Sequence, residues 1–287
     1  MNQYDIAIVG GDRRIACMAP IFAGKGYRVI CYGSQNTDDT DQALSLKEAL
    51  DTTGAIVCGI PFAKEGFVYS EIDISIPLTE LQRCLRKHQK IFGGVIPEDF
   101  RRLCEEREIG CYDFMRDEPL TLFNAVATAE GAILEALAHK ETILHRSDCL
   151  VLGFGRCGSL IAQRLRGLSA HVTVSVGNPT ELAMAGAQGF HTLPLARLRQ
   201  EIGRFDYVFN TIPACYLDEN CLRKVHPECM IIDIASGRIG VDYRAAEELS
   251  LPVRYCPGLP GKYASVSCAQ KLADFVLSNI HSKKKGV

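Results

Sequence analysis

The sequence lacks an excess of charge of either sign. Its 287 residues carry 32 Lys and Arg against 34 Asp and Glu, for a formal net charge of −2, and the pI is about 6.4. A chain without a strong basic field is not drawn electrostatically to nucleic acid or to an anionic membrane. We therefore expect neither of them among its partners.

A targeting leader and a membrane-spanning run are also missing. The opening residues, MNQYDIAIVGGDRR, hold no basic stretch followed by a long apolar region and a cleavage site. No uninterrupted apolar run reaches the ~18 residues that cross a bilayer. These absences predict a cytoplasmic protein.

Patterns of metal ligands are absent as well. The 13 cysteines form no C-x-x-C pair, and the seven histidines stand singly, so we expect no metal site. Cysteines scattered through apolar stretches of a long chain, as in AIVCGI, are typical of small buried residues rather than of a disulfide scaffold.

The sequence does have material for two hydrophobic cores, since 47% of its residues are hydrophobic. Apolar, β-rich stretches alternate with helix-like segments, which is typical of a doubly wound parallel sheet. The stretches of the first half are 5–10, 28–33, 55–60, 90–95 and 110–114. Those of the second half are 149–154, 171–176, a short piece around 189–193, 205–212, 229–235 and 253–256.

A proline-free apolar segment separates the halves. Residues 120–144 have apolar residues at helical spacing and predict a connecting helix, and residues 265–280 predict an amphipathic terminal helix. The predicted fold is therefore α/β, with two doubly wound, Rossmann-like parallel-sheet domains joined by a long helix. We expect an N-terminal domain over 1–119. The linking helix, the second domain and the C-terminal helix then occupy 120–287.

A glycine-rich turn opens the second domain. In CLVLGFGRCGSLIAQRL (149–165), Gly153, Gly155 and Gly158 form G-x-G-x-x-G between a strand-like stretch and a helix. Glycines permit a sharp turn, a close approach of the backbone to a diphosphate and tight helix–strand packing, and the helix N-terminus offers N–H groups to phosphates. This context indicates a dinucleotide site, so the second domain is predicted to bind NAD(P). A purely structural turn is the alternative.

Two residues between the glycines belong to the predicted cofactor site, Arg156 and Cys157. Cys157 stands at a helix start, where a thiol pKa is often lowered. The alternative is a small residue tolerated where space is tight.

Neutral residues follow the second strand of this domain. Where a NAD-selective enzyme usually has Asp or Glu for the ribose diol, the sequence has Ser-Val-Gly-Asn-Pro over 175–179. The missing acid favours NADP, with Ser175, Asn178 and Thr180 as neutral donors. Because no Arg or Lys follows to pair with a 2′-phosphate, NAD stays open.

Two later strands end in polar loops. Thr211, Ile212 and Pro213 follow one of them, and Ala235 and Ser236 follow the next. Both loops are expected at the carboxyl edge of the sheet, beside the nicotinamide end of a bound dinucleotide. Ordinary turn chemistry is the alternative explanation.

Two cations mark the corresponding edge of the first domain. Arg13 and Arg14 follow its first strand, and guanidinium groups bind carboxylates in bidentate geometry. The alternative is a pair of surface arginines at a helix start, where the helix dipole opposes positive charge. We expect this edge to face a cleft shared with the cofactor domain.

Several longer motifs resemble those of one known family, the A subunits of dipicolinate synthase from spore-forming bacteria. They are IVGGDRR, NAVATAEGAI (124–133), LVLGFGRCG, VFNTIPA (208–214), IIDIASG (231–237) and GLPGKYA (258–264). These motifs span nearly the whole chain in the expected order. TAEGAI and GLPGK are more specific than the glycine turn, because general Rossmann proteins lack them.

The resemblance implies the architecture of two-domain 2-hydroxy acid dehydrogenases, in which the substrate-side domain (1–119) precedes the nucleotide domain. It also implies a cytoplasmic oxidoreductase of sporulation. It implies that dipicolinate is formed from dihydrodipicolinate, or from its hydrated precursor, with hydride transfer to NADP. It also implies a heteromeric complex with a flavoprotein-like B subunit, while a homo-oligomer stays open. The alternatives are a 2-hydroxy or 2-amino acid dehydrogenase of the same architecture and a non-catalytic dinucleotide-binding subunit.

A small dicarboxylate substrate calls for cations and hydrogen-bond donors. The predicted substrate contacts are Arg13, Arg14, Asn124, Thr128, Ser236 and Lys262. The predicted catalytic residues are Arg13, Glu130, Ser236 and Lys262. Among these, Glu130 is the carboxylate of the TAEG motif, and it accepts the proton, orients Lys262 or has a structural capping role.

Two stretches depart from the family's pattern. Residues 238–240 are Arg-Ile-Gly where the family usually has Pro-Gly-Gly, and residues 263–269 replace a usual Ala-Pro-x-Thr-Ala-Gly run. Both stretches are expected near nicotinamide and substrate, so they keep the non-catalytic alternative open. No histidine lies in any motif, which disfavours an alcohol dehydrogenase of the ordinary type.

Overall fold

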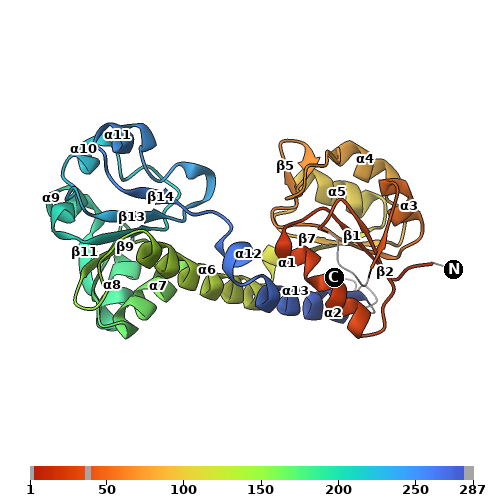
Figure 1. Ribbon diagram of the computed structural model, residues 1–287, viewed down its shortest axis with the longest axis horizontal. Coiled ribbons are helices and arrows are strands. Elements are labelled where there is room, and N and C mark those ends of the chain that lie inside the picture. Colours follow the sequence, from red (N-terminus) through yellow and green to blue (C-terminus); the bar gives the residue numbers. More distant parts are fainter. Residues whose placement is uncertain (1–2, 36–39, 281–287) are drawn as a thin grey trace. The chain divides into compact units, whose positions relative to one another are not determined.

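The computed structural model describes residues 3–35 and 40–280, and the chain divides into two units. Unit 1 comprises Met1–Phe123 and Pro260–Val287, and unit 2 comprises Asn124–Leu259 (Figure 1). The first division falls within the long helix α6, Glu118–Ala138.

Unit 1 is built on a parallel sheet of six strands in the order β3-β2-β1-β4-β7-β8. The strands are β1 (Ile6–Val9), β2 (Val29–Tyr32), β3 (Asp41–Gln42), β4 (Ala55–Val57), β7 (Lys90–Gly93) and β8 (Gly110–Asp113). A two-stranded antiparallel hairpin is formed by β5 (Ala63–Lys64) and β6 (Phe67–Val68). The helices are α1 (Arg13–Ala16), α2 (Met18–Gly24), α3 (Leu46–Asp51), α4 (Leu78–Cys84), α5 (Glu98–Glu106), the 3-10 turn η1 (Phe114–Arg116) and α13 (Ser265–Ile280).

Unit 2 repeats this topology with the strand order β11-β10-β9-β12-β13-β14. The strands are β9 (Asp148–Leu152), β10 (His171–Val176), β11 (His191–Pro194), β12 (Tyr207–Asn210), β13 (Met230–Asp233) and β14 (Val253–Tyr255). The helices are α7 (Arg156–Gly167), α8 (Pro179–Ala187), α9 (Leu198–Glu201), α10 (Glu219–Leu222) and α11 (Tyr243–Glu248), with 3-10 turns η2 (Leu195–Arg197), η3 (Ile202–Arg204) and η4 (Ser236–Arg238). A short helix, α12 (Leu259–Tyr263), crosses the second division.

Both sheets have the doubly wound order, in which the chain starts at the centre, runs to one edge and then returns to build the other side. Every residue of β1 is buried, because helices cover both faces of a parallel sheet. The predicted α/β fold with two Rossmann-like parallel sheets is confirmed.

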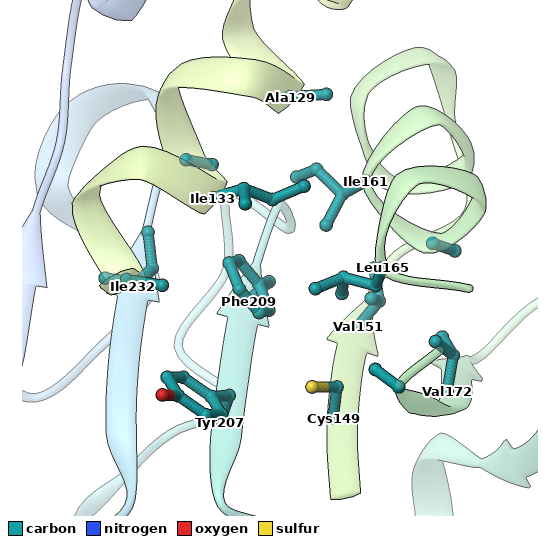
Figure 2. Close-up of a cluster of buried hydrophobic side chains, with 14 of the residues drawn as sticks. Ala129, Ile133, Cys149, Val151, Ile161, Leu165, Val172, Tyr207, Phe209 and Ile232 are labelled. Carbon is teal, nitrogen blue, oxygen red and sulfur yellow. The ribbon is translucent and has the colours of Figure 1, made fainter. Parts of the chain in front are cut away.

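The core of unit 2 shows how its first helices attach to the sheet. Figure 2 shows Ile133 of α6 and Ile161 of α7 pointing toward one another above Phe209 of β12. Ile161 and Phe209 are fully buried, and burying a side chain of this size stabilises a fold by about 1.5–3 kcal/mol. This packing fixes α7, and with it the turn that precedes α7, against β9 and β12.

The C-terminal helix α13 packs on unit 1. Ala269, Leu272 and Val276 are buried in one cluster with residues of β1, α2 and β7. The ring of Phe275 lies 5.7 Å from that of Phe114. The sequence-based division placed this helix with the second domain, but its apolar stripe meets the apolar face of unit 1.

Helix α6 is long and apolar enough to cross a membrane by length and composition alone, and half of its most apolar window is buried inside the protein. This is weak evidence for a membrane span, because a core helix of a soluble protein meets the same criterion. Ala129 and Ile133 of α6 belong to the core cluster of unit 2 (Figure 2).

Candidate dinucleotide site

The glycine turn joins β9 to α7. Gly153 has a φ of +94°, and its N–H donates to the carbonyl oxygen of Ser175 at 2.9 Å. A Cβ at Gly153 would overlap Thr211 Oγ1, and a Cβ at Gly158 would overlap the carbonyl oxygen of Gly153. Two of the three glycines are therefore required by the packing of the turn itself.

Gly155 is different, since a Cβ there would meet no heavy atom within 4 Å. It is the N-cap of α7, a 12-residue helix, and as glycine it offers no side-chain cap to the first N–H groups. The first N–H groups of such a helix, together with its dipole, favour an anion. The structure thus leaves open space at the one glycine that a diphosphate would approach.

A cavity of about 430 Å³ lies over the turn. Its lining includes eight of the predicted cofactor contacts: Gly153, Gly155, Arg156, Cys157, Gly158, Thr211, Ile212 and Pro213. The lining residues that sequence reasoning missed are Phe154, Val176, Gly177, Glu181, Leu195 and Tyr216. The structure therefore brings together the glycine turn and the loop after β12, as predicted, and adds the end of β10, Glu181 in the first turn of α8 and Leu195 after β11.

Three predicted cofactor contacts lie outside this lining. Ser175 is fully buried, and its Oγ has no hydrogen-bond partner among the described residues. Asn178 Oδ1 accepts from the N–H of Thr180 at 2.9 Å and caps α8. Ala235 is buried, and its N–H donates to Asp233 Oδ1 at 3.1 Å.

A second recess of about 400 Å³ continues from the first cavity. The two share Val176, Gly177, Leu195 and Tyr216. The second is lined in addition by Pro179, Leu182, Pro194 and Ala196. Its wall is thus almost wholly apolar, with the ring of Tyr216 at its junction with the glycine-turn cavity.

Cys157 does not have the lowered pKa that its helix-start position suggested. Burial raises the pKa of its thiol, and the charge of Arg156 and a hydrogen bond with Thr128 offset this rise only in part. The expectation of a lowered pKa is therefore wrong, because loss of solvent outweighs both of these favourable interactions. The alternative, a small residue in a tight place, fits the structure.

A buried carboxylate organises the loops after β12 and β13. Asp233 is fully buried and accepts hydrogen bonds from Asn210 Nδ2 at 2.9 Å and from the hydroxyl of Tyr243. Burial and this hydrogen bond raise the pKa of Tyr243. Asn210 in turn bonds both backbone groups of Ile212, at 3.1 and 3.2 Å. These hydrogen bonds therefore fix the position of Ile212 in the cavity lining. Ser236, in the loop after β13, is exposed.

In unit 1 the two predicted arginines differ in their surroundings. Arg13 is exposed, and its backbone N–H donates to Glu71 Oε2 at 3.1 Å. Arg14 is only 3% exposed. Its guanidinium pairs with Asp12 Oδ2, at 2.9 Å from Nε and 2.5 Å from Nη2, and also donates to the carbonyl of Ile60 at 3.0 Å. The charge of Arg14 is therefore largely compensated by Asp12 within the protein.

Lys262 is an exposed residue of α12, and its Nζ lies 4.8 Å from the centre of the Tyr263 ring. A cation at this distance from an aromatic face is attracted to it.

The three predicted residues of α6 lie in unit 2. Thr128 Oγ1 donates to the carbonyl of Asn124 at 2.8 Å. Glu130 is exposed and pairs with Arg164 of α7 at 3.3 Å. An exposed ion pair of this kind contributes at most about 1 kcal/mol. Its main effect is to tie the predicted proton acceptor to α7.

Among residues 3–35 and 40–280, no group of three or more His, Cys, Asp or Glu side chains is arranged to hold a metal ion.

Known proteins resemble this chain along its whole length. Residues 5–115 match the family model for the N-terminal domain of the dipicolinate synthase A subunit. Over 99% of its length the chain is 28% identical to the A subunit of dipicolinate synthase from Bacillus subtilis (strain 168), of which it covers 96%. The resemblance predicted from the sequence motifs is confirmed.

Solved structures support the fold. The chain superposes with a TM-score of 0.83 on the A subunit of dipicolinate synthase from Bacillus halodurans, with 24% identity and 98% coverage of each chain. With an L-alanine dehydrogenase the TM-score is 0.59 at 13% identity, over 96% of this chain and 89% of that one. The fold of the chain is therefore shared with that dehydrogenase.

Proposed function

Because the chain resembles the A subunit of dipicolinate synthase from end to end, we propose that it is an oxidoreductase subunit that forms dipicolinate. The substrate is dihydrodipicolinate or its hydrated precursor. Oxidation of the dihydropyridine removes a hydride and a proton and leaves an aromatic ring. The observation that carries the proposal is the open cavity over the glycine turn of unit 2.

The residues present fit a nicotinamide dinucleotide. Gly155 leaves open space at an uncapped helix N-terminus, and Arg156 supplies a cation in the same lining. These groups would hold the diphosphate by backbone N–H groups and by charge. When bound, the nicotinamide ring supplies a hydride acceptor. The proposal covers NADP, which the sequence favours, as well as NAD.

The work left to the protein is mainly positioning, because forming an aromatic ring is intrinsically downhill. Arg13 and Lys262 are both exposed cations suited to the two substrate carboxylates. Arg14 is paired with Asp12, and we assign it the task of fixing the loop that carries Arg13. Glu130 and Ser236 are the proposed proton acceptor and polar support, with Asn124 and Thr128 as further substrate contacts.

The name of the relatives also suggests a second type of chain in the enzyme. We assign to this protein a partner B subunit in a cytoplasmic complex that acts in sporulation. If the partner contributes to the reaction, turnover by the isolated chain is slow. Each assay is therefore run with and without the B subunit.

The test is a turnover assay with freshly prepared dihydrodipicolinate. Wild-type protein, with and without the B subunit, is mixed with NAD or NADP while absorbance at 340 nm and dipicolinate are followed. We expect both to rise together, and we expect variants Arg13→Ala and Lys262→Ala to raise KM more than they lower kcat. Turnover of a 2-hydroxy or 2-amino acid in place of the dihydropyridine would refute the substrate. Tight dinucleotide binding without turnover in any mixture would favour a non-catalytic subunit.

A further inference from the structure

Glu181 is the one carboxylate among the residues that line the glycine-turn cavity. It is the third residue of α8, and it is half-buried. Val176 and Gly177, which precede α8 in the chain, line both the glycine-turn cavity and the apolar recess. Glu181 thus lies on the wall of the first cavity, close to where the apolar recess begins.

The local sequence suggests a different task for this side chain. Asn178-x-x-Glu181 is a capping-box pattern, in which the glutamate would return to the N–H of the N-cap residue. The structure has only half of that box, since Asn178 Oδ1 accepts from the N–H of Thr180. No hydrogen bond or ion pair of Glu181 is seen within 3–35 and 40–280. Helix capping therefore does not use this carboxylate.

The order of groups in a dinucleotide decides what meets Glu181. With the diphosphate on the glycine turn, the adenine ring fits the apolar recess of about 400 Å³, whose wall includes Pro179, Leu182 and Leu195. The ribose that joins these two groups must then pass the shared segment, Val176 and Gly177. A ribose placed there would have Glu181 on the wall of the same cavity.

We propose that the Glu181 carboxylate accepts hydrogen bonds from the adenosine ribose diol and makes this chain selective for NAD over NADP. The inference rests on the proposed function, because it requires a dinucleotide on the glycine turn. A 2′-phosphate carries about −1.5 to −2 charges at neutral pH, and the carboxylate would repel it while losing the hydroxyl partner. Among the described residues of both linings, Arg156 is the only cation, and it stands at the glycine turn.

This inference reverses the preference for NADP that the sequence suggested. That preference depended on the neutral stretch 175–179. Glu181 comes two residues later, where the first turn of α8 brings it back to the cavity.

The test is binding, measured by calorimetry on the full chain with NAD, NADP, ADP-ribose and 2′-phospho-ADP-ribose. For the wild type we expect NAD to bind about 100-fold more tightly than NADP. Glu181→Gln should weaken the affinity for NAD about tenfold, and it should reduce the preference for NAD over NADP, expressed as the ratio of their Kd values, at least tenfold. Glu247→Gln, an equal charge change at an exposed residue of α11, should leave both affinities unchanged.

A variant that is expected to gain affinity for NADP provides a second test, which does not depend on a loss of binding. A Cβ at Gly177 would lie 3.6 Å from Leu195 Cδ2, an ordinary contact, so the backbone there accepts a side chain. Gly177→Arg combined with Glu181→Gln should bind NADP at least tenfold more tightly than the wild type does.

The outcomes separate the two proposals. Equal wild-type affinity for NAD and NADP, or an unchanged ratio in Glu181→Gln, would overturn the role of Glu181 and leave the dinucleotide site standing. Binding of none of the four ligands by the wild type would overturn the proposed function, and the role of Glu181 with it.

Discussion

Substitution of Gly155 by aspartate separates ligand binding from folding. The backbone of Gly155 has φ −74° and ψ −162°, an extended conformation that any residue adopts, and it is the N-cap of α7. Aspartate and asparagine are favoured N-cap residues, so neither should cost stability there. A side chain at this position points into open space, where the proposed site holds a diphosphate.

The expected loss of affinity follows from charge. At about 4 Å and an effective dielectric constant of about 20, one pair of like charges costs about 4 kcal/mol. At about 1.4 kcal/mol per factor of ten, this is roughly a thousandfold in Kd. Gly155→Asn adds nearly the same volume without the charge, so we expect it to lose only a part of this affinity. The difference in Kd between the two variants therefore measures the electrostatic repulsion between the aspartate and the bound diphosphate.

The assay pairs thermal unfolding of the free proteins with titration by NADH fluorescence. Free Gly155→Asp and Gly155→Asn should unfold at or slightly above the wild-type Tm, while the aspartate variant binds at least 100-fold more weakly than the asparagine variant. Gly158→Ala is the contrasting control, because its Cβ would overlap the Gly153 carbonyl and lower the Tm. Wild-type affinity in Gly155→Asp would refute the placement of the diphosphate.

Three further predictions test the packing around this site and in unit 1. Lys90 Nζ donates to the carbonyls of Asn279 and Ile280 at 2.7 and 2.6 Å, so Lys90→Met should destabilise the docked end of α13 by about 1–3 kcal/mol, measured by urea unfolding. The raised pKa of Tyr243 means that the unfolded chain loses its phenolic proton first, so stability should fall as pH rises above about 10; Tyr243→Phe should flatten that slope, and an unchanged slope would contradict it. Burial raises the pKa of the Cys157 thiol, so mass spectrometry should show slower alkylation at pH 8 than for a free thiol, and slower still with NAD bound.

Features that depend on local pattern could be predicted from the sequence. The near-continuous apolar strands and their alternation with helices identified two parallel sheets, because burial on both faces leaves little freedom in composition. The glycine turn could also be predicted, since the three glycines stand at their spacing within one strand–turn–helix segment and Gly158 packs against the Gly153 carbonyl in it. The hairpin of β5 and β6 was not visible, because its strands are two residues long.

Features that depend on how helices and strands pack in space could not be predicted from the sequence. The stripe of α13 indicated an apolar face, but nothing in the pattern names the surface that it covers. Glu181 and Tyr216 join the cavity from a helix and from the loop after β12, and only the folded sheet brings them beside Gly155. The pattern predicts Arg14 as a substrate contact, and it gives no sign of the ion pair that the fold forms between Arg14 and Asp12, two residues away.

The most direct test of the central claim is a crystal structure of the chain grown with NAD. We predict the diphosphate within hydrogen-bond distance of the backbone N–H groups of residues 155–158, and the adenosine ribose on Glu181. A dinucleotide bound away from the glycine turn, with residues 153–158 making no contact to its phosphates, would contradict the account.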